Sequence, residues 1–170
     1  MFAGGKTGRI RRLIILAAVL ATGCAATGAR LEPGRSTAAD VEREMGQPAE
    51  RISLGKGESL WFFPRGSAAR QTFAVRLGAD GVVREVSQVR TRQNLGRLEL
   101  DKSTADDVQR ILGPPDRITT NPRIQRTVWQ YNMFDDTRAV IVYVQFDPAE
   151  KVREVFMTDD PAFVNPGAAW

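Results

Sequence analysis

Two stretches of the chain have the spacing of a short amphipathic helix. In each, apolar residues three or four positions apart share one helical face: Val41 with Met45, and Val108 with Ile111 and Leu112. Each stretch starts with a Thr that is followed three residues later by Asp, which is a helix cap, and ends with a left-handed Gly and then a Pro, where a helix cannot resume. We therefore predict two helices of about two and a half turns, bounded by Thr37, Asp40, Gly46 and Pro48 and by Thr104, Asp107, Gly113 and Pro115.

After each helix the apolar period changes from 3.6 to 2, the spacing of a half-buried strand. The first set of strands runs through Trp61 and Phe63, then 73–77 and 83–86, and the second through 128–133, 140–146 and 152–157. Short turns containing Gly, Pro or Asp separate these strands, so consecutive strands should pair antiparallel. The predicted fold class is α+β, a tandem repeat of a helix packed on a three-stranded antiparallel sheet.

The second half of the chain repeats the first at an offset of about 67 residues. STAADV at 36–41 recurs as STADDV at 103–108, LWFF at 60–63 as VWQY at 128–131, and VREV at 83–86 and again at 152–155. We assign a first repeat to 31–97, a second to 98–160 and a C-terminal tail to 161–170. Trp61 and Trp129 are repeat positions, and we interpret them as core residues that pack under the helix.

The first 24 residues read as a targeting segment. Residues 1–12 are small and basic, Leu13 to Ala21 form an apolar run too short for a spanning helix, and Thr22-Gly23-Cys24 follows. The alternatives are a retained transmembrane anchor and a Cys without a role. The segment resembles the signal peptide and lipobox of bacterial lipoproteins, with Ala21 where Leu is usual. That resemblance implies a signal peptide at 1–23, lipidation of Cys24 and a lipidated tether at 24–30, and Ala25 implies the outer membrane.

Composition removes most catalytic chemistry. His is absent and Cys occurs once among 170 residues, which excludes His-dependent triads, zinc clusters and an intrachain disulfide. The net charge of +4 comes from the four basic residues before Leu13, and the rest of the chain is balanced, so nucleic acid is not an expected partner. We expect no enzymatic activity, no metal and no cofactor. The acidic pairs are interpreted as turn and cap residues: Asp106-Asp107, Asp135-Asp136 and Asp159-Asp160.

The helix, Gly-Pro stop, Trp strand and lipobox occur in the order typical of one family. In these residues the chain resembles the SmpA/OmlA (BamE-like) small lipoproteins, over 31–88 and again over 98–158. A single copy is usual there, and the duplication is similar instead to β-lactamase-inhibitory proteins, which carry disulfides that this chain lacks. The first resemblance implies a periplasm-facing scaffold on the outer membrane that supports β-barrel assembly or envelope integrity. The alternative is an inhibitor-like module that binds a soluble periplasmic protein.

Two bulky apolar residues fall on the face of the second sheet that should point away from its helix. Ile141 and Tyr143 alternate with three inward-facing Val residues, where the first repeat has Ala74 and Arg76. An open sheet face normally presents polar residues to water, so these side chains mark either a partner-binding site or a surface covered by the tail at 163–170. The sequence leaves both explanations open.

Charge divides between the repeats, with a net charge of +4 over 30–97 and −4 over 98–170. Either the basic repeat is attracted to anionic lipid headgroups beside the anchor, or the two repeats attract one another.

Overall fold

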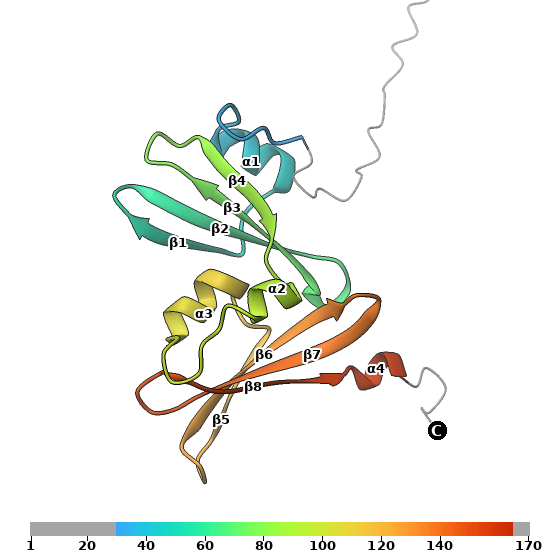
Figure 1. The fold of residues 1–170 in the computed structure, drawn as a ribbon. Helices are drawn as coiled ribbons and strands as arrows, with labels where there is room; N and C mark the ends of the chain where they lie inside the picture. Colours follow the sequence, from blue (N-terminus) through green and yellow to red (C-terminus); the bar gives the residue numbers. More distant parts are fainter. Residues whose placement is uncertain (1–29, 165–170) are drawn as a thin grey trace, which may run out of the picture.

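Residues 30–164 are described by the structure, a computed structural model, and they form two antiparallel sheets of four strands each (Figure 1). The predicted signal peptide, Cys24 and the tether as far as residue 29 lie outside the described residues, as do residues 165–170 of the tail. Along the described chain, no helix is both long and apolar enough to cross a membrane.

Apart from one short 3-10 turn in the first half, the two halves have the same order of elements. The first half contains α1 (Ala38–Met45), β1 (Glu50–Gly55), β2 (Glu58–Arg65), the short 3-10 turn η1 (Ser67–Ala69), β3 (Gln71–Leu77), β4 (Val83–Gln88) and the short helix α2 (Arg92–Leu95). The second half contains α3 (Ala105–Leu112), β5 (Arg117–Asn121), β6 (Arg126–Asp135), β7 (Arg138–Phe146), β8 (Val152–Asp159) and α4 (Pro161–Val164). Within each sheet the strands lie side by side in chain order. The α+β class is as expected.

The prediction of three strands in each sheet was wrong, because each sheet has a fourth strand at its edge. Both additional strands, β1 and β5, directly follow the helix stop and pair with the Trp-containing strand. Every residue of β5 is exposed, and β1 alternates only between exposed and half-buried positions. An edge strand that buries little apolar surface gives no strong period-2 pattern, and for that reason the sequence did not reveal these strands.

Both helices begin and end where the sequence predicts. Thr37 caps α1 and Thr104 caps α3, and in each case the Asp three residues later accepts a hydrogen bond from the Thr backbone N–H, at 2.8 and 2.9 Å. These bonds to Thr37 and Thr104 lower the pKa of Asp40 to about 2 and also lower that of Asp107. The Gly that ends each helix has a positive φ, but its ψ is extended rather than left-handed helical.

Each helix covers one face of its own sheet. The core under α1 contains Val41, Phe63 and Val75, with Trp61 packed at its margin, and the core under α3 contains Val108 and Tyr131. Trp129 packs at the margin of this second core, where its ring lies 4.8 Å from that of Phe146. Both Trp side chains therefore lie against the cores.

The two halves stack in series, in the order α1, first sheet, α3, second sheet (Figure 1). The back face of the first sheet, which is turned away from α1, carries a smaller cluster of Phe62, Ala74 and Val89. The end of α3 approaches this face so closely that a Cβ on Gly113 would lie 3.0 Å from the Phe62 ring. Thus α3 contacts its own sheet on one side and the preceding sheet on the other.

Candidate functional site

The outer face of the second sheet is the face turned away from α3, and Ile141 and Tyr143 lie on it, as predicted. Tyr143 lies opposite Phe156 of β8, and the two rings stack with their centroids 4.9 Å apart. Phe156 is 39% exposed, whereas Ile141 and Tyr143 are half-buried. We call these three side chains the aromatic patch. The sequence analysis missed Phe156, although its alternation with Val155 and Met157 could have placed it on this face.

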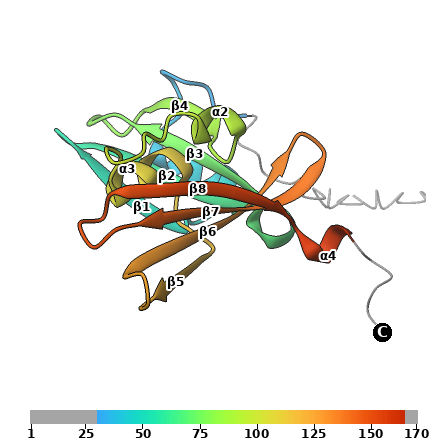
Figure 2. The same cartoon turned by 60° about the horizontal axis from the view of Figure 1, so that its bottom comes forward.

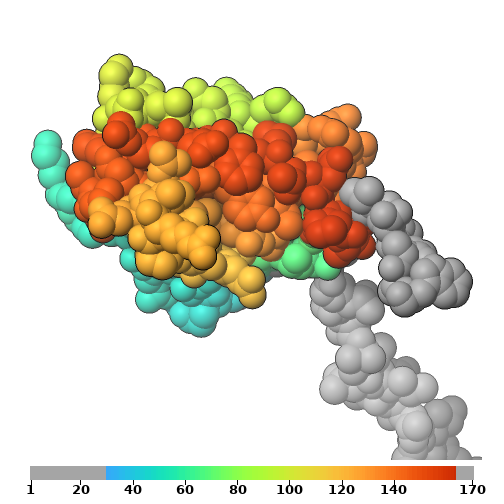
Figure 3. Space-filling model, turned by 90° about the horizontal axis from the view of Figure 1, so that it is seen from below, coloured from blue at the N-terminus to red at the C-terminus, as the bar shows by residue number. Residues whose placement is uncertain are grey.

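Polar side chains surround the aromatic patch. Arg126 donates hydrogen bonds to Gln145 at 2.9 Å and to Glu154 at 3.1 Å, and Gln130 and Thr158 lie directly across from Tyr143 and Ile141. In Figures 2 and 3 strands of the second sheet form this face, and none of the described helices crosses it. An apolar centre with a polar rim is the usual composition of a protein-binding surface.

The outer face of the second sheet and the back face of the first sheet differ in the size of the side chains in one row across the strands. In the first sheet the strand register aligns Phe62, Ala74 and Ser87; the end of α3 approaches Phe62, and the small Ala74 and Ser87 line an open cleft beside it. The corresponding row of the second sheet is Gln130, Tyr143 and Phe156. Tyr143 therefore corresponds to Ala74, and the correspondence of Tyr143 to Arg76 in the sequence analysis was wrong by two residues. The bulky Tyr143 and Phe156 therefore take up space on this face where the first sheet has small side chains.

The described beginning of the tail packs away from the aromatic patch. Phe163 of α4 lies beside Phe134, at the end of the sheet where β6 turns into β7, and the two residues line one cavity with Ala139. The guanidinium of Arg70, which comes from the first half, lies 4.3 Å from the centre of the Phe163 ring. The remaining predicted cover, residues 165–170, lies outside the described residues.

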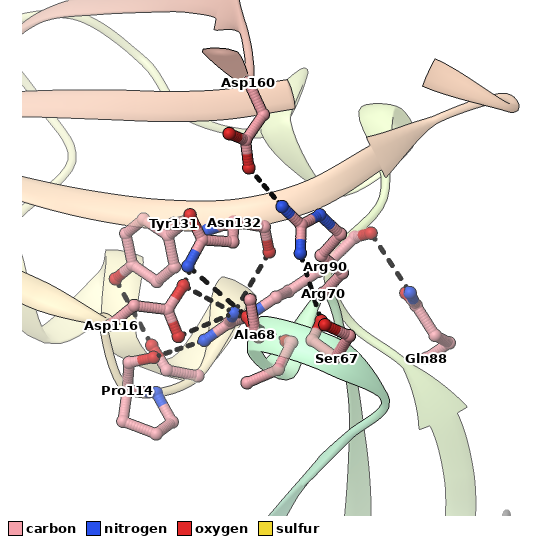
Figure 4. A network of polar contacts seen from close by, with 12 residues as sticks. Ser67, Ala68, Arg70, Gln88, Arg90, Pro114, Asp116, Tyr131, Asn132 and Asp160 are labelled. Carbon is pink, nitrogen blue, oxygen red and sulfur yellow. Dashed lines mark hydrogen bonds and ion pairs between the residues drawn. The ribbon is translucent and has the colours of Figure 1, made fainter. Parts of the chain in front are cut away.

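Arg90 holds the two halves together in the joint between them (Figure 4). Its side chain is 1% exposed and lies between the halves, just after β4. It donates to both carboxylate oxygens of Asp116 at 2.8 and 2.9 Å, and to the backbone carbonyls of Ala69, Pro114 and Asn132. A buried guanidinium needs this many acceptors to offset the loss of its hydration.

Two further ion pairs cross the same joint. Arg70, 3% exposed, pairs with Asp160 at the end of β8. Arg92 of α2 donates to both carboxylate oxygens of Asp135, which also accepts from Arg138 at 3.0 Å. These two arginines lower the pKa of Asp135 to about 2. The interpretation of Asp135 and Asp160 as turn and cap residues was therefore incomplete.

The ion pairs of the joint help to explain why the two repeats have opposite net charges. Arginines of the basic half pair with aspartates of the acidic half where the halves meet; Arg70 and Arg90 are buried there, whereas Arg92 is exposed. Mutual attraction of the halves therefore explains part of the division, and the opposite net charges in the sequence already indicated this attraction. The sequence did not show which arginine pairs with which aspartate, because that depends on how the halves stack.

The charged groups of the joint pair with one another, although the Nε atoms of Arg70 and Arg90 are buried without a hydrogen-bond partner among the described residues. Among residues 30–164, no group of three or more His, Cys, Asp and Glu side chains is arranged to hold a metal ion. Burial raises the pKa of the Tyr131 hydroxyl, which donates a hydrogen bond to the carbonyl of Gly113 at 3.3 Å.

No protein-family model and no curated protein matches this chain. Among solved structures, it is similar to a DUF4309 family protein (YjgB) from Bacillus subtilis, with 17% identity, a TM-score of 0.31, and coverage of 76% of this chain and 82% of the other. It is also similar to a candidate β-lactamase inhibitor protein from Streptococcus mutans, with 11% identity, a TM-score of 0.33, and coverage of 73% and 83%. These scores are too low to assign the chain to the family of either protein.

Proposed function

We propose that this chain is a lipid-anchored scaffold on the periplasmic face of the outer membrane that binds another envelope protein, in β-barrel assembly or in maintaining envelope integrity. The observation that carries the proposal is the aromatic patch, an apolar centre with a polar rim on a sheet face that no described element covers. The proposal includes acylation of Cys24 and no catalytic activity.

We further propose that the chain is a duplicated SmpA/OmlA (BamE-like) domain. The shared order of elements, the two capping boxes and the two Gly residues of positive φ at the helix ends support a duplication. The fourth strand in each half belongs to the repeated unit, because β1 and β5 occupy the same place in chain order and in the sheet.

The energetics of this proposal depend on the membrane anchor. Covering ~200 Å² of apolar surface at ~25 cal/mol per Å² contributes about 5 kcal/mol, most of which the cost of association offsets. Five residues, 25–29, lie between Cys24 and the described chain, and this stretch spans at most ~20 Å, which would keep the α1 end of the stack close to the membrane. Confinement of both proteins to one surface raises their effective concentration, so a weak contact becomes a lasting one.

Site-specific photocrosslinking tests the binding surface. A photoreactive residue at Tyr143, in the full lipidated chain in living cells, should capture a membrane protein of the barrel-assembly machinery. The same residue at Glu44, which lies on α1 at the opposite end of the stack, should not. Adducts with a soluble periplasmic enzyme would favour the inhibitor-like alternative, and adducts with only the chain itself would contradict the scaffold.

Metabolic labelling tests the anchor separately. Cells given labelled palmitate should incorporate it into the wild-type chain and not into Cys24→Ala, and only the wild type should fractionate with the outer membrane. Absence of label from the wild type would remove the anchor from the proposal while leaving the patch experiment interpretable.

A further inference from the structure

A concave surface lies between the two halves, away from the aromatic patch. It is a cleft of about 670 Å³, whose floor is the open part of the back face of the first sheet. Leu54, Leu60, Ala74, Arg76, Glu85 and Ser87 form this floor, and the other wall comes from the segment around α2 and from α3. A volume of this size is in the usual range for a ligand site.

The wall around α2 and α3 carries two arginines that stand outside the ion pairs of the described chain. Arg97 and Arg110 both line the cleft, and within the described residues neither forms an ion pair. Arg97 donates one hydrogen bond to Asn94 at 3.2 Å. On the floor, Arg76 is already paired with Glu58 at 2.6 Å and lies across from Glu85. The free positive charge therefore belongs to the wall.

Polar groups of the cleft are also left unused by the fold. Ser87 and Gln93 line it, and within the described chain their side chains make no hydrogen bond. Asp107, which interacts electrostatically with Arg110 on the same helix, is engaged in the cap with Thr104. Donors and acceptors beside two free guanidiniums suit a ligand that carries both carboxylates and amides.

We propose that this cleft binds an acidic, extended peptide segment of a partner protein. The lining crosses from β1 to β4, which are three strand spacings apart, or about 14 Å, and this distance equals about four residues of extended chain. Guanidiniums bind carboxylates through paired, charge-assisted hydrogen bonds, so Arg97 and Arg110 hold two acidic side chains. The amide and hydroxyl groups around α2 meet the peptide backbone. This site is independent of the aromatic patch and of the anchor.

Fluorescence anisotropy tests the proposal with the full chain in detergent and a fluorescein-labelled hexapeptide of glutamate as the probe. We expect saturable binding by the wild type and none of a hexapeptide of glutamine. The double variant Arg97→Gln, Arg110→Gln should weaken binding at least tenfold, because each arginine supplies a charge-assisted pair. Ser87→Trp, which fills the floor and keeps every charge, should weaken binding as well.

The matched control is the double variant Arg35→Gln, Arg43→Gln. It removes the same charge from two exposed arginines outside the cleft, and Arg43 occupies in α1 the place that Arg110 occupies in α3. Its affinity should change less than twofold. Equal losses in both double variants would show non-specific attraction, and equal displacement by free glutamate would show a site for single anions; either result, or no binding by the wild type, overturns the proposal.

Discussion

Single residues at the helix ends have different surroundings in the two halves, although the sequence repeats there. Gly46 and Gly113 share a positive φ of 78° and 81° with an extended ψ, a conformation that side chains other than Gly adopt only with strain. A Cβ on Gly46 would meet nothing within 4 Å, whereas one on Gly113 would press on Phe62 and Thr72. Backbone strain therefore constrains both glycines, whereas lack of space for a side chain constrains only Gly113.

Replacing each of these glycines with Ala separates the two constraints. Gly46→Ala should lower the free energy of unfolding by about 1–3 kcal/mol through backbone strain alone. Gly113→Ala should lower it by about 1–3 kcal/mol more, because Phe62 has to move. Urea denaturation of the two variants measures the difference, and equal losses would contradict the close approach of α3 to the first sheet.

The lowered pKa of Asp135 makes the stability of the folded protein depend on pH in the acidic range. Its pKa is about 2 in the folded protein, because Arg92 and Arg138 donate to it, and near 4 in an unfolded chain. Its ion pairs therefore contribute fully above about pH 4, and the contribution decreases as the pH falls toward 2. In thermal melts from pH 7 to 2, Asp135→Asn should have a lower Tm at neutral pH, and its difference from the wild type should shrink below pH 4. A constant difference across this range would contradict the role of the ion pairs.

Among the elements, helices were predictable from the sequence and edge strands were not. A capping box and a Gly-Pro stop lie within ten residues of each other, so Thr37 and Thr104 mark their helices without knowledge of the rest of the fold. β5 pairs only with β6, and all of its residues are exposed, so its sequence shows no alternation of apolar and polar residues. Ile141 and Tyr143 were placed on the correct face because strand alternation is also local.

The cap of α3 should matter to both sheets, because this helix contacts both. Thr104→Ala removes a cap worth about 1 kcal/mol, and it should increase amide hydrogen exchange in β2 and β3 as well as in β6 and β7. Thr37→Ala on α1 should increase exchange in the first sheet alone. Mass spectrometry of exchange by segment distinguishes these patterns, and confinement of the Thr104→Ala effect to the second sheet would argue against α3 as a shared layer.

For the whole molecule, the joint and the cleft were beyond sequence reasoning for one physical reason. Arg90 and Asp116 lie 26 residues apart in different repeats, and the cleft has its floor in the first half and part of its wall, from α3, in the second. Both features depend on how the two halves pack on each other, and neither the hydrophobic periodicity nor the helix-capping residues of the sequence indicate that packing. The charge division between the halves showed only that an attraction exists.

Breaking the joint should cost more than breaking a surface pair. Arg90→Ala removes a donor from three carbonyls and leaves the Asp116 carboxylate without its cation, with only the Asn132 N–H of the described chain still donating to it, and it should lower the free energy of unfolding by about 3–5 kcal/mol. The control Arg84→Ala removes an exposed pair with Asp80 and should cost about 1 kcal/mol or less. Guanidinium denaturation checks both variants, and similar small losses would mean that Arg90 does not hold the halves together.

The order of these partners along the chain has a consequence for biosynthesis. Ribosomes deliver the N-terminal half first, with Arg70 and Arg90 already present, but Asp116 comes later and Asp160 comes only after the last strand. Until then the nascent first half holds two guanidiniums that cannot be withdrawn from water. Its final docking must therefore wait for translation of the second sheet, so a prematurely terminated product would retain an open, protease-sensitive surface.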